Sequence, residues 1–205
     1  MSAEKGSDLT SDQRDALQEI ANIGMGQAGS LIGKIWGEFV NLSIPRIAHI
    51  DRRSIPAALT RLVGDETVNA VRQAFHGPIR GEVIVVFSGG RGDQLRELMG
   101  YEEADSVEEQ ELLLDVANIL VGACLGGIAE TLGVEIGFSA PSVMGLDVSP
   151  TKLIRSEELN TGRALFVEVR FTLEKKSLAS HLVVLMPEDE FAVLGRALDK
   201  FLASI

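Results

Sequence analysis

Two patterns of carboxylate and carboxamide residues occur in this sequence with the same internal spacing. The first pattern comprises Asp15, Glu19, Asn22 and Pro45, and the second comprises Glu111, Asp115, Asn118 and Pro141. The two asparagines lie 96 positions apart, as do the two prolines. Steps of four and three residues place the polar side chains of each pattern on one face of a helix. A carboxylate beside a carboxamide is a plausible pair for orienting water, so the sequence predicts a duplicated active surface.

A solvated polar stripe on a helix would explain a single copy of this pattern. The duplication favours a functional interpretation, because the spacing to the distant prolines is kept as well. Asparagine competes for backbone hydrogen bonds and is only a moderate helix former. Its presence at matching positions, Asn22 and Asn118, in the middle of two predicted helices therefore indicates a local role.

Composition and charge narrow the possible functions. The chain has 205 residues, of which 45% are hydrophobic and 24% charged, as in ordinary globular proteins. Its net charge of −11 argues against a nucleic-acid-binding protein and against docking on anionic lipid. Cys124 is the single cysteine and excludes an internal disulfide, which favours the reducing cytoplasm.

No membrane segment is expected. Residues Met1–Asp15 are polar and do not resemble a secretory signal. The apolar stretch Leu112–Leu132 contains Asp115, Asn118 and Glu130, which favours a buried helix over a membrane span.

The expected elements form an α/β fold. Thr10 and Gln13 form a capping box, so a long helix should begin near Thr10, after a loose leader of residues 1–9, and end near Gly37. A second long helix should run from about Ser106 to Leu132. Expected strands are Phe39–Ile50 with Pro45 at an edge or bend, Gly81–Ser88, Val134–Ser139, Ala164–Leu173 and Ser180–Met186. Shorter helices should follow, one capped by Asp93 and one at Glu188–Leu202, with a loop or short irregular elements at 148–163. Ser54–Leu62 and Glu66–Phe75 are ambiguous.

The repeat extends beyond the polar patterns, because apolar residues and glycines also match at this offset. We therefore expect a single domain over residues 1–205, built from two pseudo-twofold-related halves at about 10–100 and about 106–203. A central, largely antiparallel sheet should be packed by the two motif-bearing helices and by further helices. Neither half is expected to bury its own long apolar helix.

Other motifs have structural interpretations. The glycines of Gly24–Gly29 match a dinucleotide fingerprint, but they follow a helix instead of a strand, so they are expected to pack helices. The Ser88–Asp93 turn lacks the lysine of a phosphate-binding loop. His49, His76 and His181 show no metal-ligand spacing, and His181 is expected to be a packed or edge residue.

The two patterns resemble the motif of the CheC/CheX/FliY family of chemotaxis response-regulator phosphatases, which is Asp or Ser, x3, Glu, x2, Asn, x22, Pro. The first copy matches this motif at Asp15, Glu19, Asn22 and Pro45. The second copy matches at Asn118 and Pro141 and departs from it at Glu111 and Asp115. Two copies in a chain of this length resemble a CheC-type member, and a flagellar switch domain such as that of FliY is not expected.

The resemblance implies a reaction. The substrate would be the phospho-aspartate of a CheY-like receiver domain, and the asparagines would orient a water molecule for attack on phosphorus. Glu19 and Asp115 would pair with a receiver lysine, while Mg²⁺ would come from the receiver and not from a cofactor of this chain. Because Asp115 is one methylene shorter than Glu19, the first site should be the stronger.

Two other functions remain open. A non-catalytic adaptor would bind a CheD-type receptor deamidase or a receiver domain. A structural component of the flagellar motor would assemble stably with motor proteins.

Overall fold

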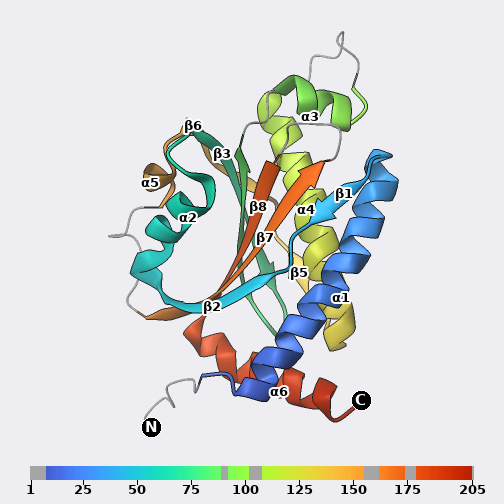
Figure 1. The fold of residues 1–205 in the computed structure, drawn as a ribbon, viewed down its shortest axis with the longest axis vertical. Helices are drawn as coiled ribbons and strands as arrows, with labels where there is room; N and C mark the ends of the chain where they lie inside the picture. The colour runs from blue at the N-terminus through green and yellow to red at the C-terminus, as the bar shows by residue number, and fades with distance from the viewer. Residues whose placement is uncertain (1–7, 89–91, 102–107, 155–161, 174–178, 205) are drawn as a thin grey trace.

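An antiparallel sheet lies between two layers of helices (Figure 1). The structure is a computed structural model that describes residues 8–88, 92–101, 108–154, 162–173 and 179–204. Helices α1 (Ser11–Trp36) and α4 (Glu109–Leu132) cover one face of the sheet, and α2 (Ile55–Val63) and α5 (Pro150–Leu153) cover the other. Helices α3 (Gly92–Leu98) and α6 (Phe191–Leu202) pack at the ends of α4 and α1.

The strands of the two halves interlock. The strands are β1 (Val40–Leu42), β2 (Arg46–Asp51), β3 (Val68–His76), β4 (Gly81–Ser88), β5 (Gly137–Phe138), β6 (Ser142–Val148), β7 (Arg163–Leu173) and β8 (Ala179–Pro187). The order is β1-β7-β8-β4-β3-β5, with β2 also paired to β7 and β6 also paired to β3. The edge strands of the first half therefore pair with β7 of the second half, and those of the second half pair with β3 of the first.

Two equivalent pairs of hydrogen bonds connect the halves where the edge strands are exchanged. The Ser43 amide donates to the Arg170 carbonyl (3.0 Å), and the Ser43 hydroxyl accepts from the Arg170 amide (3.0 Å). The Ser139 amide donates to the Ala74 carbonyl (3.0 Å), and the Ser139 hydroxyl accepts from the Ala74 amide (3.1 Å). Ser43 and Ser139 are 96 positions apart, and so are Ala74 and Arg170. The two halves thus make the same contact, each with the other.

The predicted limits of α1 agree with the structure. The Gln13 amide donates to Thr10 Oγ1 (3.2 Å), and the Thr10 amide donates to Gln13 Oε1 (3.0 Å), which completes the capping box. Gly37 ends the helix with φ 65°, a conformation that suits glycine. Of the expected loose leader, Leu9 is instead buried (2% exposed), while residues 1–7 lie outside the described residues.

Glycines bring α1 and α4 into backbone contact. A Cβ atom added to Gly24 would lie 2.8 Å from the Ile128 nitrogen, and one added to Gly127 would lie 2.7 Å from the Gly24 carbonyl oxygen. Gly29 packs on Leu42, but a Cβ atom on Gly26 would meet nothing within 4 Å. The prediction of helix-packing glycines is therefore correct for Gly24, whereas Gly29 packs against strand β1.

Helix α4 forms the centre of the core. It is long and apolar enough to cross a membrane, but 61% of its most apolar window is buried within the fold. Cys124 is fully buried, and burial raises the pKa of its thiol above the ordinary value. The expectation of a buried helix is thus met.

Several expected boundaries were wrong. The strand Phe39–Ile50 is broken into β1 and β2 around Pro45, which cannot donate to the ladder. The sequence missed β6, and Val134–Ser139 contains only the two-residue β5. The two segments that the sequence left ambiguous, Ser54–Leu62 and Glu66–Phe75, correspond to α2 and β3. Asp93 lies inside α3 instead of capping it, because the helix begins at Gly92.

A buried histidine–glutamate contact and an arginine that binds two carboxylates stand out among the described residues. His181 Nδ1 lies 3.0 Å from Glu168 Oε1 inside the sheet, so His181 is packed, as expected. Arg163 binds Asp8 (2.5 Å) and Glu188 (2.7 Å), and its hydrogen bond lowers the pKa of Asp8.

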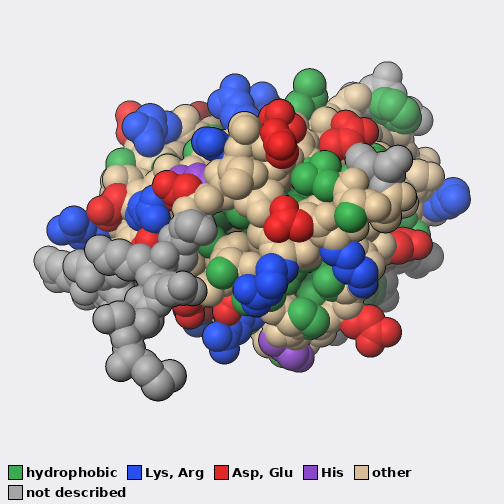
Figure 2. Space-filling view, turned by 90° about the horizontal axis from the view of Figure 1, so that it is seen from below, with side chains coloured by type: hydrophobic (Ala, Val, Ile, Leu, Met, Phe, Trp, Pro, Cys, Tyr) green, Lys and Arg blue, Asp and Glu red, His purple; other side chains and the backbone are tan. Residues whose placement is uncertain are grey.

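On the underside of the molecule, acidic and basic side chains are intermixed with small apolar areas (Figure 2).

Candidate functional site

The first polar pattern lies on the solvent face of α1. Asp15, Glu19 and Asn22 are exposed, whereas Leu17 and Ile20 between them are buried. The helix thus separates the polar residues from the apolar residues that fix it to the sheet, as the spacing predicted.

Pro45 joins this site from the edge of the sheet. It is buried in the break between β1 and β2. Its carbonyl oxygen accepts a hydrogen bond from Gln18 Nε2 (3.1 Å), and the same nitrogen lies 3.4 Å from Asn22 Oδ1. Gln18 therefore links the proline segment to the asparagine.

The second polar pattern is arranged in a similar way on α4. Glu111, Asp115 and Asn118 are exposed, and Pro141 is half-buried between β5 and β6. Here Gln73 of β3 makes the link. Its Nε2 donates to Asn118 Oδ1 (2.8 Å) and to the Ser139 carbonyl oxygen (2.9 Å), and the side chain is 2% exposed.

Sequence reasoning missed both glutamines. Gln18 lies one helical turn before Asn22, within reach by the i,i+4 rule, and could have been found from that spacing. Gln73 lies on a different element, and its only signal was a polar residue within an apolar strand. Among the described residues, no side-chain hydrogen bond links Asp15 or Glu111 to the asparagines, so their supporting role stays a prediction.

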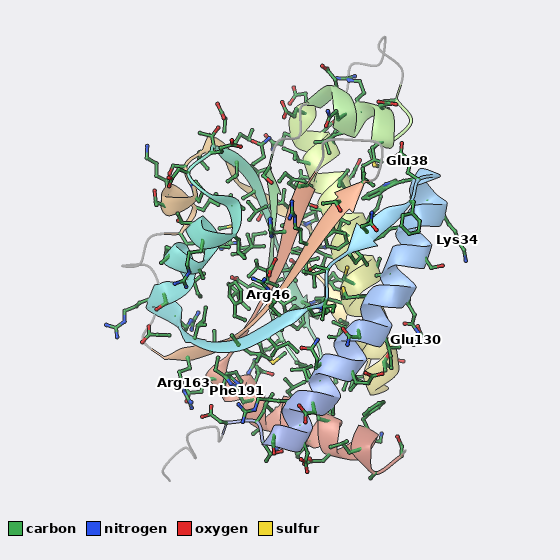
Figure 3. All side chains as sticks on the ribbon, in the orientation of Figure 1. Lys34, Glu38, Arg46, Glu130, Arg163 and Phe191 are labelled. Carbon is green, nitrogen blue, oxygen red and sulfur yellow. The ribbon has the colours of Figure 1, made fainter. Side chains whose placement is uncertain are left out.

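An open groove of about 900 Å³ begins at Asn22 and Pro45. It runs between the second half of α1 and residues 37–45, and Lys34 projects from the outer side of α1 at this end of the helix (Figure 3). Phe39 and Ile44 on its rim are 66% and 75% exposed. The equivalent positions in the second half carry Glu135 and Ala140, so the two sites have different surroundings.

The geometry suits a large substrate. Glu19, Asn22, Asp115 and Asn118 are exposed on helix surfaces, and the groove at Asn22 is open, unlike a closed pocket that would hold a small molecule. Within the described ranges, no group of three or more His, Cys, Asp or Glu side chains could hold a metal ion. The chemistry available is that of a neutral carboxamide beside a carboxylate.

Comparisons with solved structures reveal the same fold in chemotaxis proteins, although no family model matches the sequence. Thermotoga maritima FliY is similar with a TM-score of 0.67 and 17% identity over 94% of this chain and 98% of FliY. The FliM middle domain from Vibrio alginolyticus is similar with a TM-score of 0.60 and 13% identity, over 89% of this chain and 99% of that domain. CheX from Desulfovibrio desulfuricans is similar with a TM-score of 0.52 and 14% identity, over 81% of this chain and 99% of CheX. These likenesses establish a shared α/β fold.

Proposed function

We propose that this chain, whose fold is that of the CheC/CheX/FliY family of chemotaxis proteins, hydrolyses the phospho-aspartate of a CheY-like receiver domain. The observation that carries the proposal is the paired presentation of Glu19 with Asn22 and of Asp115 with Asn118 on exposed helix faces. In each pair the asparagine is tied through a glutamine to the strand segment that carries the motif proline.

In this proposal the asparagine orients the attacking water. A carboxamide offers a donor and an acceptor and carries no charge, so it can approach a phosphoryl group without repulsion. Phosphoryl transfer depends mainly on positioning and electrostatic stabilisation, so a fixed amide is a sufficient contribution from this chain. The receiver supplies Mg²⁺ and the phosphoryl group.

The carboxylates act in docking. Glu19, and Asp115 at the second site, pair with a lysine of the receiver and fix its orientation. The exposed apolar residues Phe39 and Ile44, on the rim of the groove that begins at Asn22, favour a protein partner, because protein interfaces have apolar cores. A receiver of this kind places the reaction in the cytoplasm.

The test is the decay of a CheY-like receiver labelled with acetyl phosphate, measured with and without this chain after the acetyl phosphate has been removed. We expect the decay rate to rise in proportion to the concentration of the chain, even when the chain is present in much smaller amounts than the receiver. Decay at the receiver's own rate, despite binding of the receiver, would contradict catalysis.

Binding of the receiver without faster decay would favour the adaptor function. The likeness to FliM middle domains, including FliM from H. pylori in a complex with SpeE, supports a role in binding without catalysis. The partner would be a receiver domain or a CheD-type deamidase. Pull-down of each candidate with the Asn22→Ala/Asn118→Ala variant would separate binding from catalysis.

A further inference from the structure

We infer that Gln73 is a positioning residue of the second site, which holds the Asn118 carboxamide with its oxygen inward and its nitrogen toward solvent. The inference rests on the proposed function, because it assigns the orientation of a group that acts there. It concerns a residue outside both polar patterns and on a different element from Asn118.

A backbone carbonyl determines the orientation. The Ser139 carbonyl oxygen lies 2.9 Å from the Gln73 amide nitrogen, and a carbonyl oxygen can only accept a hydrogen bond. Gln73 must therefore present its nitrogen, and not its oxygen, toward the site. The same nitrogen lies 2.8 Å from the Asn118 side chain. Asn118 must then present Oδ1 to Gln73, which leaves Nδ2 facing outward.

The burial of Gln73 argues that its donors are needed. Val71 and Phe75, its neighbours on the same face of β3, belong to the apolar core. Gln73 is 2% exposed, and its Oε1 is buried without a hydrogen-bond partner among the described residues. An unpaired buried carbonyl lowers stability, so packing alone would favour an apolar residue here.

The first site makes the same kind of link with a residue that is not equivalent. Gln18 bridges Asn22 and the Pro45 carbonyl, yet the position equivalent to Gln18 in the second half is Leu114, and that equivalent to Gln73 is Val169. A contact inherited passively from a duplication would use equivalent residues. Its recurrence from different elements indicates that the proposed function requires a fixed carboxamide at both sites.

The two sites should therefore differ both in their affinity for the receiver and in their kcat. Gln73 holds Asn118 at 2.8 Å from a buried position, whereas Gln18 is half-buried and lies 3.4 Å from Asn22. The second site has the better-held carboxamide, but Asp115 reaches less far toward a receiver lysine than Glu19 does. We expect the second site to bind the receiver weakly and to retain a substantial kcat.

The kinetic test places Gln73→Met in two backgrounds. In the Asn22→Ala variant only the second site works, and Gln73→Met should lower its kcat roughly five- to tenfold with KM within about twofold, because one hydrogen bond is lost. In the Asn118→Ala variant, where only the first site works, Gln73→Met should leave kcat unchanged. An equal loss in both backgrounds, or no loss in the first, would overturn the inference.

A second readout needs no phosphatase activity. Nitrogen-15 relaxation of the Asn118 side-chain amide should show restricted motion, compared with exposed Asn41, and Gln73→Met should release it. If Asn118 is as mobile as Asn41, or if Gln73→Met leaves its motion unchanged, the positioning role is wrong whatever the activity. If Asn118 is restricted and Gln73→Met releases it while Asn22→Ala is inactive, the proposed catalysis fails at this site although Gln73 holds the carboxamide.

Discussion

Glu19 and Asp115 occupy the same position in the two patterns, but their carboxylates differ in reach by one methylene, or about 1.5 Å. Glu19→Lys should raise the receiver concentration needed for half-maximal rate about tenfold or more, because a close charge pair across an interface contributes at least about 1.5 kcal/mol. Binding should also become less dependent on salt. Titration of the receiver at two salt concentrations measures both effects.

The matched control for this prediction is Glu130→Lys. Glu130 is an exposed glutamate on α4, beyond Asn118 toward the end of the helix, and the substitution changes the net charge by the same amount (Figure 3). It should leave the titration unchanged. An unaltered affinity with a lost maximal rate in Glu19→Lys would contradict docking and would assign the carboxylate to the water chemistry.

At this scale the sequence predicted the exposed residues better than their partners. Glu19 and Asn22 could be placed on one face because helical periodicity is local. Gln73 could not be assigned to Asn118, because their contact depends on how β3 packs against α4, and the two residues are 45 positions apart.

The crossing of α1 and α4 depends on two glycines. Gly24→Ala or Gly127→Ala would place a methyl group against backbone of the other helix and should lower the free energy of unfolding by about 1–3 kcal/mol. Gly26→Ala and Gly122→Ala are the controls, since neither methyl group would meet an atom within 4 Å. These should raise stability by up to about 1 kcal/mol through helix propensity. Urea unfolding measures all four, and equal effects in both pairs would contradict backbone contact.

Helices were easier to predict than strands in this chain. The capping box at Thr10 and the glycines at 37 and 133 mark the ends of α1 and α4 locally. Strand β6 was missed because it is only partly buried and forms irregular pairs with β3. Its place is set by a partner more than 60 positions earlier in the chain, which no local pattern reveals.

The exchange of edge strands makes each half dependent on the other. A fragment of residues 1–104 lacks β7, on which β1 and β2 pair, and a fragment of residues 105–205 lacks β3, on which β5 and β6 pair. We expect each fragment alone to lack cooperative unfolding, and an equimolar mixture to regain it. Circular dichroism during heating tests this, and a cooperatively folded single fragment would contradict it.

Cys124 reports on the opening of the whole molecule. It lies in the core with its thiol pKa raised, so the reactive thiolate is rare in the folded state. Iodoacetamide at pH 8 should label the native protein far more slowly than the urea-unfolded protein. Fast labelling of the native protein would show that α4 is not buried as described.

If Asn22 and Asn118 orient the water that attacks the phospho-aspartate of a receiver, replacing them should slow the loss of phosphate. The most direct measurement is the decay of a phosphorylated CheY-like receiver with the intact chain, with Asn22→Ala, with Asn118→Ala and with the double variant. Because Asn22 is exposed, Asn22→Ala should unfold within about 0.5 kcal/mol of the parent, whereas Asn118→Ala removes the acceptor of buried Gln73 and should lower the free energy of unfolding by about 1–3 kcal/mol. At a receiver concentration below KM, Asn22→Ala should lose most of the acceleration, Asn118→Ala a minority, and the double variant nearly all. A folded double variant that still accelerates decay as the intact chain does would contradict a catalytic role for the two asparagines.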